Sequence, residues 1–238
     1  MTLISIIIPT KNEEELLPRL LDDISKQTLK DFEVIIADAD SSDNTRKIAR
    51  DRGCRIAEGG LPGVGRNKGA QLAKGNFYIF FDADVTLRKN FLAKAYSEFQ
   101  KRYLEIASCK VYPDESGEQY KGWFELYNGI NEVSQYIRPS SLGNFMMMTS
   151  RLFHRLHGFK EDIRLGEDYE FVKRASKLTR FRILKDTSIK VSMRRIDEEG
   201  IMKYVTRNIR SELHRAFIGE ITVENDRIEY EFDNYNAS

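Results

Sequence analysis

Two aspartates separated by one residue end a strongly apolar segment, and they are the clearest candidates for chemistry in this sequence. Residues 77–87 read FYIFFDADVTL, so Asp82 and Asp84 follow five apolar or aromatic residues, and Thr86 comes two residues later. Two kinds of chemistry use such a sequence motif. Asp82 can be a nucleophile that takes up a phosphoryl group, or both carboxylates can be hard oxygen ligands for a divalent cation.

A second acidic pair, Glu167 and Asp168, follows Gly166 and precedes an apolar helical pattern. Carboxylates at a helix start commonly cap it, because they accept hydrogen bonds from its first N–H groups. A carboxylate in a site can instead act as a general base and remove a proton from a hydroxyl group. The sequence by itself leaves both uses open.

Short polar groups follow the first two apolar runs. Residues 9–12 read Pro-Thr-Lys-Asn, which is a common turn but could also contact the edge of a base. Asp38 ends the second run and is followed by Ala39, Asp40 and Ser41. Its carboxylate could accept a hydrogen bond from a base or a ribose hydroxyl, or could serve as an ordinary turn or helix cap.

Two further stretches could bind phosphate. Residues 63–69, GVGRNKG, combine flexible glycines with Arg66 and Asn67 beside a helix start. Backbone N–H groups in such a turn suit phosphate, although an ordinary loop-to-helix turn has the same composition. Arg194 and Arg195 follow a late strand, and paired guanidinium groups bind diphosphate well, although a surface basic pair is the alternative.

The elements that must position these groups alternate between strand and helix. Continuous apolar runs predict buried parallel strands at 3–9, 32–38, 54–59, 76–84 and 103–113. The segments between them have helical spacing, which predicts a doubly wound parallel sheet. Such sheets bind ligands beyond the carboxyl ends of their strands, so we expect the loops at 9–13, 38–43 and 82–86 on one rim.

The second half is less regular. Its patterns predict a helix over 120–136, two short strands over 181–184 and 188–193, a helix over 200–217 and a terminal hairpin over 221–232. We find no internal repeat and no low-complexity linker. We therefore expect one continuous domain over 1–218, followed by a hairpin or tail over 219–238.

Composition narrows the functional classes. The chain has 238 residues, 41% of them hydrophobic, and a net charge of +1, which argues against a generic nucleic-acid binder. Cys54 and Cys109 stand in strand-like contexts typical of buried thiols in a reducing cell. We see no signal peptide and no apolar stretch long enough to span a membrane, so we expect a cytoplasmic protein. A basic stretch from Lys173 to Arg215 suits either solvent or the inner membrane surface.

The motifs, taken in order, resemble one family. IIIPTKNEE, VIIADADSSDNT, GRNKGAQLAKG, FFDAD and GEDYEF strongly resemble family-2 glycosyltransferases over roughly residues 3–195. The resemblance implies a GT-A fold, with a mostly parallel mixed sheet flanked by helices and a C-terminal helix and hairpin. It also implies an inverting, metal-dependent transfer from a UDP- or GDP-sugar to a sugar, lipid or small-molecule acceptor, with Mg²⁺ or Mn²⁺ as the cation. The nucleotide-binding half would cover about 1–112 and the acceptor half about 113–218.

The resemblance also implies roles for single residues. Asp168 matches the catalytic base, with Glu167 beside it, and Asp84 matches the metal ligand, helped by Asp82. The nucleotide side is matched by Pro9, Thr10, Asn12, Glu13, Asp38, Arg66, Asn67 and Asp82, with Arg194 or Arg195 at the diphosphate. The family's usual Asp-Asp-Gly-Ser after the second strand is Asp38-Ala39-Asp40-Ser41 here, which weakens the assignment of Asp38 to the base.

Two alternatives stay open from the sequence. FFDADVTL also matches the Asp-x-Asp-x-Thr opening of haloacid-dehalogenase-type phosphatases. That interpretation leaves Pro-Thr-Lys-Asn-Glu, Asp38 and the Arg-Asn-Lys-Gly stretch unexplained. The second alternative is a non-catalytic protein that binds a sugar nucleotide without transferring the sugar. The sequence does not predict an oligomeric state.

Overall fold

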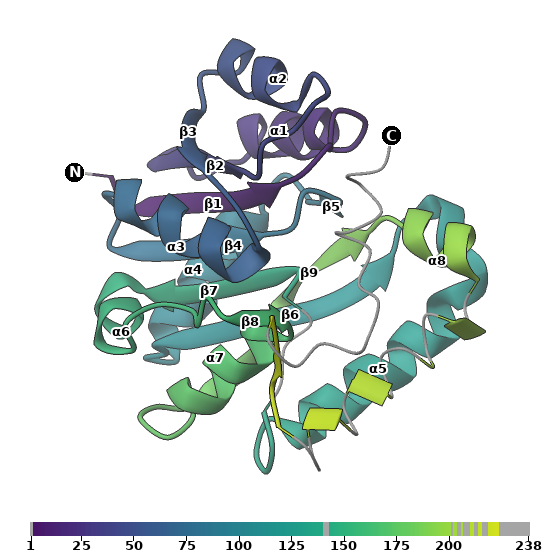
Figure 1. Cartoon of the computed structure of the whole chain (residues 1–238). Coiled ribbons are helices and arrows are strands. Elements are labelled where there is room, and N and C mark those ends of the chain that lie inside the picture. The colour runs from purple at the N-terminus through teal and green to yellow at the C-terminus, as the bar shows by residue number, and fades with distance from the viewer. Residues whose placement is uncertain are drawn as a thin grey trace.

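The computed structural model describes residues 2–139, 143–200, 202, 203, 206, 210, 211, 214, 215 and 219–223. Eight strands form one mixed sheet in the order β3-β2-β1-β4-β7-β6-β9-β5 (Figure 1). These strands are β1 (Ile4–Thr10), β2 (Phe32–Asp38), β3 (Arg55–Glu58), β4 (Phe77–Phe81), β5 (Val85–Thr86), β6 (Ile106–Pro113), β7 (Phe145–Thr149) and β9 (Phe181–Val191). Four neighbouring pairs are parallel and three are antiparallel, which confirms the expected mostly parallel mixed sheet.

The carboxyl ends of the first strands meet at one edge. β1 pairs with β2 and β4 in parallel, and Thr10 stands opposite Asp38 in the register. β7 runs antiparallel to β4, so the start of β7 reaches this same edge. There the backbone N–H of Asp82 donates to the carbonyl of Asn144 at 3.3 Å. The edge therefore gathers polar side chains from segments far apart in the sequence.

Helices cover both faces of the sheet. One core packs against α1 (Leu17–Ser25), α2 (Thr45–Asp51) and α4 (Phe91–Lys101), and the other packs against α3 (Pro62–Leu72), α6 (Ser150–Arg155) and α7 (Glu167–Ala175). In β1, Ile6 and Ile8 enter the first core and Ile7 enters the second, and all three are fully buried. Because successive strand residues point to opposite faces, a strand covered on both sides needs a continuous apolar run.

Helix α3 corrects one expectation. Residues 63–69, predicted as a glycine-rich turn with phosphate-binding N–H groups, lie inside α3. Their glycines serve close packing instead: a Cβ at Gly69 would lie 2.4 Å from Cγ2 of Ile7, and one at Gly65 would lie 3.4 Å from Cβ of Pro9. The absence of side chains at these positions lets α3 approach β1 closely, and its helical hydrogen bonds occupy most of the N–H groups.

The second half adds helices around one long strand. The helix predicted over 120–136 is present as a 3₁₀ turn, η1 (Glu115–Tyr120), followed by α5 (Lys121–Ser134). The prediction of two short strands was wrong, because β9 runs continuously from Phe181 to Val191. Its register against β6 shifts after Cys109, and Glu98 accepts the backbone N–H groups of Lys185 and Asp186 at this irregularity. The buried carboxylate of Glu98 therefore satisfies these N–H groups, and β9 continues through a stretch whose polar residues predict a break between two strands.

The C-terminal elements are described only in part. α8 (Arg194–Glu199) follows β9, and β10 (Ile221–Thr222) pairs antiparallel with β8 (Ile163–Leu165). Most of the helix predicted over 200–217, and the hairpin predicted over 221–232 beyond its first residues, lie outside the described residues. Within the described parts of the chain, no helix has both the length and the apolar character needed to cross a bilayer.

Candidate functional site

Arg66 stands at the centre of the polar edge. Its side chain on α3 is only 3% exposed. Nη1 donates to Glu167 on α7, and Nη2 donates to Oδ1 of Asp82 at 3.0 Å. Burial opposes the charge of Arg66, but Glu167, Asp82 and Asp168 outweigh that effect and raise its pKa. A single guanidinium therefore joins the end of β4 to the start of α7.

Asp168 lies beside this pair and is half-buried. Burial and the negative charge of Glu167 raise its pKa to about 7, against the opposing effect of Arg66. A carboxyl group with this pKa gains and loses a proton near neutral pH, which is what general-base catalysis requires. Gly166, with φ of +87°, ends the preceding strand segment and starts α7, so the acidic pair enters the site on a helix N-terminus.

Asp82 and Asp84 differ in their surroundings. Both oxygens of Asp82 accept protein hydrogen bonds, Oδ1 from Arg66 at 3.0 Å and Oδ2 from Nδ2 of Asn144 at 3.2 Å. Asp84 is half-buried and follows the end of β4, and its backbone carbonyl accepts from Ser192 at 3.1 Å. The two aspartates therefore differ in that Asp82 is tied through both carboxylate oxygens to Arg66 and Asn144.

The described residues do not build a complete metal cage. Among them, no group of three His, Cys, Asp or Glu side chains is arranged to hold a metal ion. Mg²⁺ and Mn²⁺ with nucleotides need fewer protein ligands, because phosphate oxygens and water fill the remaining positions. One or two carboxylates at the end of β4 are compatible with that kind of site.

Asp38 is integrated into the loop that follows β2. It accepts hydrogen bonds from Thr10 Oγ1 at 3.1 Å, from the backbone of Ser41 at 3.0 Å and from the guanidinium of Arg46. Burial raises the pKa of Asp38, but these hydrogen bonds outweigh it and hold the pKa below its usual range. The structure thus brings Thr10 and Asp38 together, and Asp38 shapes the loop between β2 and α2.

The loop after β1 is tied to its neighbours. Asn12 has φ of +52°, and its Oδ1 accepts from the backbone of Ser42 at 2.9 Å. Glu13 is buried and pairs with Nη2 of Arg194 at 3.2 Å, so the start of α8 reaches the loop after β1. Pro9 borders Gly65 of α3. The side chain of Arg195 lies outside the described part of the chain.

Asn67 lies apart from the other predicted site residues. Its Nδ2 donates to the carbonyl of Phe159 at 2.8 Å and to Glu161 at 2.9 Å, while its Oδ1 accepts from the backbone of Phe159 at 2.9 Å. These bonds hold the turn that precedes β8. The structure therefore uses Arg66 and its neighbour Asn67 for different purposes.

Two residues of the site were missed from the sequence. Asn144 binds Asp82, and Gly143 lies so close to Asp168 that a Cβ there would be 2.9 Å from Oδ2. The available signal was the Gly-Asn pair immediately before the apolar run of β7. A glycine with φ of +78° at the start of a buried strand indicates close approach of another group.

Comparisons with known proteins identify the family of the chain. The profile of the glycosyl transferase family 2 matches residues 5–184. The uncharacterized glycosyltransferase EpsJ of Bacillus subtilis is 28% identical over 188 residues, covering 71% of this chain and 54% of that protein. The 4,4'-diaponeurosporenoate glycosyltransferase of Staphylococcus haemolyticus is 34% identical over 120 residues, covering 46% of this chain and 32% of that protein. The chain thus spans about half, or less, of the length of these curated relatives.

Solved structures share the fold. The mannosyltransferase PcManGT of Pyrobaculum calidifontis, solved with GDP-Man and Mn²⁺, superposes with a TM-score of 0.69 at 21% identity, covering 87% of this chain and 64% of that one. S. aureus TarS superposes with a TM-score of 0.65 at 20% identity, covering 98% of this chain and 47% of that one. The GT-A fold is thereby confirmed, and the profile match over most of the sequence shows that the chain belongs to glycosyltransferase family 2.

Proposed function

We propose that the protein is an inverting glycosyltransferase that moves a sugar from a nucleoside-diphosphate sugar to an acceptor hydroxyl or a lipid phosphate. The observation that carries the proposal is Asp168, a half-buried carboxyl group with a pKa of about 7 beside the Arg66 cluster. It lies at the edge of the sheet where GT-A enzymes bind their donors. Family membership supports the reaction class.

The two acidic residues at the start of α7 have different roles in the proposed reaction. Asp168 takes the proton of the acceptor hydroxyl, and the acceptor oxygen forms a bond to the anomeric carbon. The bond from that carbon to the diphosphate breaks, and the nucleoside diphosphate leaves with its electron pair. Attack from the side opposite the leaving group inverts the configuration. Glu167 is held by Arg66 next to Asp168. Its negative charge there raises the pKa of Asp168.

A divalent cation, Mg²⁺ or Mn²⁺, would be held by Asp84 with help from Asp82. When bound, it would supply positive charge that stabilises the departing diphosphate. PcManGT with GDP-Man and Mn²⁺, and a mycobacterial glucosyl-3-phosphoglycerate synthase with Mn²⁺ and UDP, support this proposal by analogy of fold. Arg194 lies at the same edge and would add charge at the diphosphate, as Arg195 would on the sequence evidence.

Donor and acceptor are proposed at the level of chemical class. Structures of similar fold contain UDP-GlcNAc or GDP-Man, which supports a UDP- or GDP-sugar donor bound by the half at about 1–112. Related proteins are named for poly(ribitol-phosphate) and for 4,4'-diaponeurosporenoate, so acceptors in this family differ widely. We place the acceptor in the half at about 113–218, within one catalytic domain over 1–218. A cytoplasmic location, at or near the inner membrane surface, suits such acceptors.

The test has two stages. Thermal unfolding is first measured with UDP, GDP and their sugar conjugates, with and without Mn²⁺. Release of nucleoside diphosphate from the stabilising donor is then followed in the wild type, in Asp168→Asn and in the surface control Asp51→Asn. We expect binding in all three proteins and loss of turnover only in Asp168→Asn. Binding without turnover in the wild type would favour the non-catalytic binder, and hydrolysis of p-nitrophenyl phosphate that Asp82→Asn abolishes would favour the phosphatase.

A further inference from the structure

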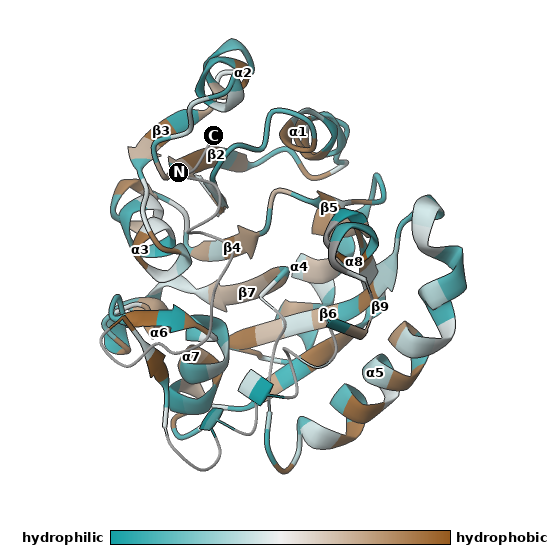
Figure 2. Ribbon diagram, turned by 45° about the vertical axis from the view of Figure 1, so that its right-hand side comes forward, coloured by the Kyte–Doolittle hydropathy of each residue, from teal (hydrophilic) through white to brown (hydrophobic). Residues whose placement is uncertain are grey.

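Helix α5 carries an apolar stripe that faces solvent. Trp123, Leu126, Ile130 and Val133, with Ile137 in the turn that follows, recur at alternating spacings of three and four residues. This spacing places them along one side of a helix. They are 59%, 58%, 56%, 65% and 84% exposed, respectively. Figure 2 shows hydrophobic residues along α5.

The opposite side of α5 is held to the sheet by amide groups. Asn128 accepts from the backbone N–H of Val111 at 3.1 Å and donates to the carbonyl of Val111 at 2.8 Å. Gln135 accepts from the backbone N–H of Ile183 at 3.0 Å. Both side chains are 5% exposed. The helix therefore turns Phe124 and two buried amides inward, and its further apolar stripe, which faces outward, indicates a binding surface.

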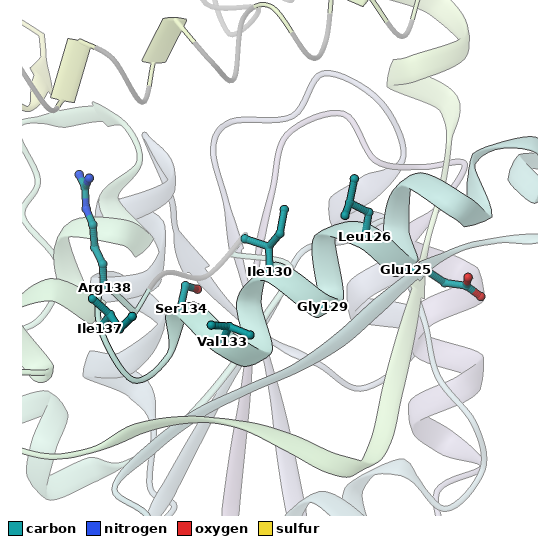
Figure 3. Close-up of a pocket in the computed structure, with 8 residues that line it drawn as sticks. All are labelled: Glu125, Leu126, Gly129, Ile130, Val133, Ser134, Ile137 and Arg138. Carbon is teal, nitrogen blue, oxygen red and sulfur yellow. The ribbon is translucent and has the colours of Figure 1, made fainter.

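The stripe borders an open hollow of about 700 Å³ on the surface of α5. Its wall includes Leu126, Ile130, Val133 and Ile137, and Arg138 lies at one end (Figure 3). In Figure 3, Leu126 and Ile130 project from the same side of α5. A groove of this kind suits an extended apolar chain, and the guanidinium at its end suits an oxyanion.

The charged end of the groove leads to the base. Nε of Arg138 donates to the hydroxyl of Tyr169 at 2.8 Å, and Tyr169 directly follows Asp168. Asp168 is also the residue against which Gly143 lies, since a Cβ at Gly143 would be 2.9 Å from Oδ2. A ligand with its apolar chain in the groove and its head at Arg138 would thus lie next to α7, the helix that carries Asp168.

We propose that this groove binds the apolar chain of an amphiphilic acceptor whose oxyanion head, a phosphate or a carboxylate, lies at Arg138 and is separate from the hydroxyl group that Asp168 deprotonates. The proposal rests on the proposed function and specifies its acceptor class. A glycan acceptor would need polar partners, which the groove wall lacks between Leu126 and Ile137 apart from Ser134. An anionic bilayer surface is the alternative occupant of the stripe, and titration with vesicles distinguishes it from a monomeric amphiphile.

Trp123 provides a direct test, because it is the only tryptophan of the chain and stands at the start of the stripe. Its emission is recorded during titration with dodecyl phosphate or dodecanoate below the micelle concentration. The comparison ligands are inorganic phosphate, dodecyltrimethylammonium and vesicles of phosphatidylcholine with phosphatidylglycerol. We expect saturable blue shifts with both anionic amphiphiles, none with inorganic phosphate, and binding of the cationic amphiphile about tenfold weaker.

Substitutions test separately the contacts to the apolar chain of the ligand and those to its oxyanion head. Ile130→Gln should weaken every amphiphile about tenfold, whereas the control Leu178→Gln, at an exposed apolar position outside the stripe, should leave binding unchanged. Arg138→Gln should weaken only the anionic amphiphiles, and Arg138→Lys should retain most of their binding. Nucleotide-dependent thermal shifts measured on the same variants should not change, so a failure of donor binding is seen separately.

Several results would overturn the proposal. They are equal affinity for anionic and cationic chains, a blue shift with vesicles but not with monomeric amphiphile, and unchanged binding in Ile130→Gln. Sedimentation would reveal another occupant: self-association that Ile130→Gln abolishes, in the absence of amphiphile binding, would assign the stripe to a second copy of the chain.

Discussion

Gly143 lies against Asp168 so closely that any side chain at residue 143 would meet the carboxylate, with a Cβ 2.9 Å from Oδ2 and 3.4 Å from Nη2 of Arg66. The φ of +78° at Gly143 adds a backbone preference for glycine. The position is therefore restricted by both space and conformation, and both restrictions act on the proposed base.

Gly143→Ala should displace the Asp168 carboxylate and slow donor hydrolysis about 10- to 100-fold, because small displacements of a reacting group carry large kinetic costs. Donor affinity, measured by nucleotide-dependent thermal shift, should change little. Gly122→Ala is the matched control, since a Cβ at Gly122 in α5 meets no atom within 4 Å. Equal rates in Gly143→Ala and the wild type would remove Asp168 from the reaction.

Asp168 should make the reaction depend on pH near neutrality. Because the base acts in its ionised form and its pKa is about 7, donor hydrolysis should rise about tenfold between about pH 6 and about pH 8. Asp168→Asn should be slow at every pH, with no such rise. A wild-type profile that is flat across this range would contradict the assignment.

The ionisation of Asp168, which should raise the rate as pH increases, should lower the stability of the fold over the same direction of pH change. The pKa of Asp168 is higher in the folded chain than the ordinary 3.8, so the folded state holds a proton that the unfolded state releases. Its contribution to the free energy of unfolding is therefore greatest at low pH and is lost as pH rises toward 7. Relative to Asp168→Asn, the wild type should lose at most about 1.4 kcal/mol per pH unit between about pH 5 and 6.5 in urea denaturation.

Arg66→Met should destabilise the fold by about 3–5 kcal/mol, because it leaves Glu167 and Asp82 without their shared cation. Arg66→Lys should cost less, since it keeps the charge but cannot bridge both carboxylates with a planar fork. Arg50→Met, at an exposed position of α2, should stay within about 0.5 kcal/mol of the wild type. Urea denaturation measures all three, and a neutral Arg66→Met would show that the cluster does not depend on its cation.

Asn67→Ala should lower stability by about 1–3 kcal/mol without weakening nucleotide binding, because its amide bonds to the turn at 159–161 and not to the Arg66 cluster. Gln71→Ala, exposed on the same helix, should be close to neutral. If Asn67→Ala instead abolished the nucleotide-dependent thermal shift while remaining folded, the family-based role of Asn67 at the nucleotide would stand.

Removal of the cation should weaken nucleotide binding more than it weakens the fold. A chelator should reduce the thermal shift produced by UDP or GDP in the wild type and leave the unfolding midpoint of the protein alone unchanged, because the cation site needs the diphosphate. Asp84→Asn should reproduce the chelator effect, and Asp51→Asn should not. Full nucleotide binding by Asp84→Asn in Mn²⁺ would move the cation to another group.

The sequence predicted the elements whose patterns depend on burial alone. The continuous apolar runs of β1, β2 and β4 could be recognised because a strand covered on both faces admits few polar residues. α3 was misjudged in its first turns, because glycines that allow close helix–sheet packing have the same composition as a flexible phosphate loop. β9 was split because Lys185 and Asp186 break its apolar pattern, while Glu98, distant in sequence, satisfies their N–H groups.

The sequence proposed residues for the candidate site, but it could not predict how they are connected. The acidic pairs and Arg66 were found from motifs, because their types and spacing are local properties. The bridge from Asp82 through Arg66 to Glu167 spans 101 residues at its longer step, and no local pattern encodes it. The same limit applies to Asn67, whose partners at 159–161 belong to another part of the chain.

The attachment of α5 through Asn128 and Gln135 has a consequence for how such a protein can diversify. Both amides bind main-chain atoms of β6 and β9, so they hold the helix whatever side chains stand on its outer side. Substitutions along that outer side can then accumulate without disturbing the architecture. Descendants of one ancestral enzyme could exchange one recipient molecule for another there, while the machinery that handles the activated sugar stays the same.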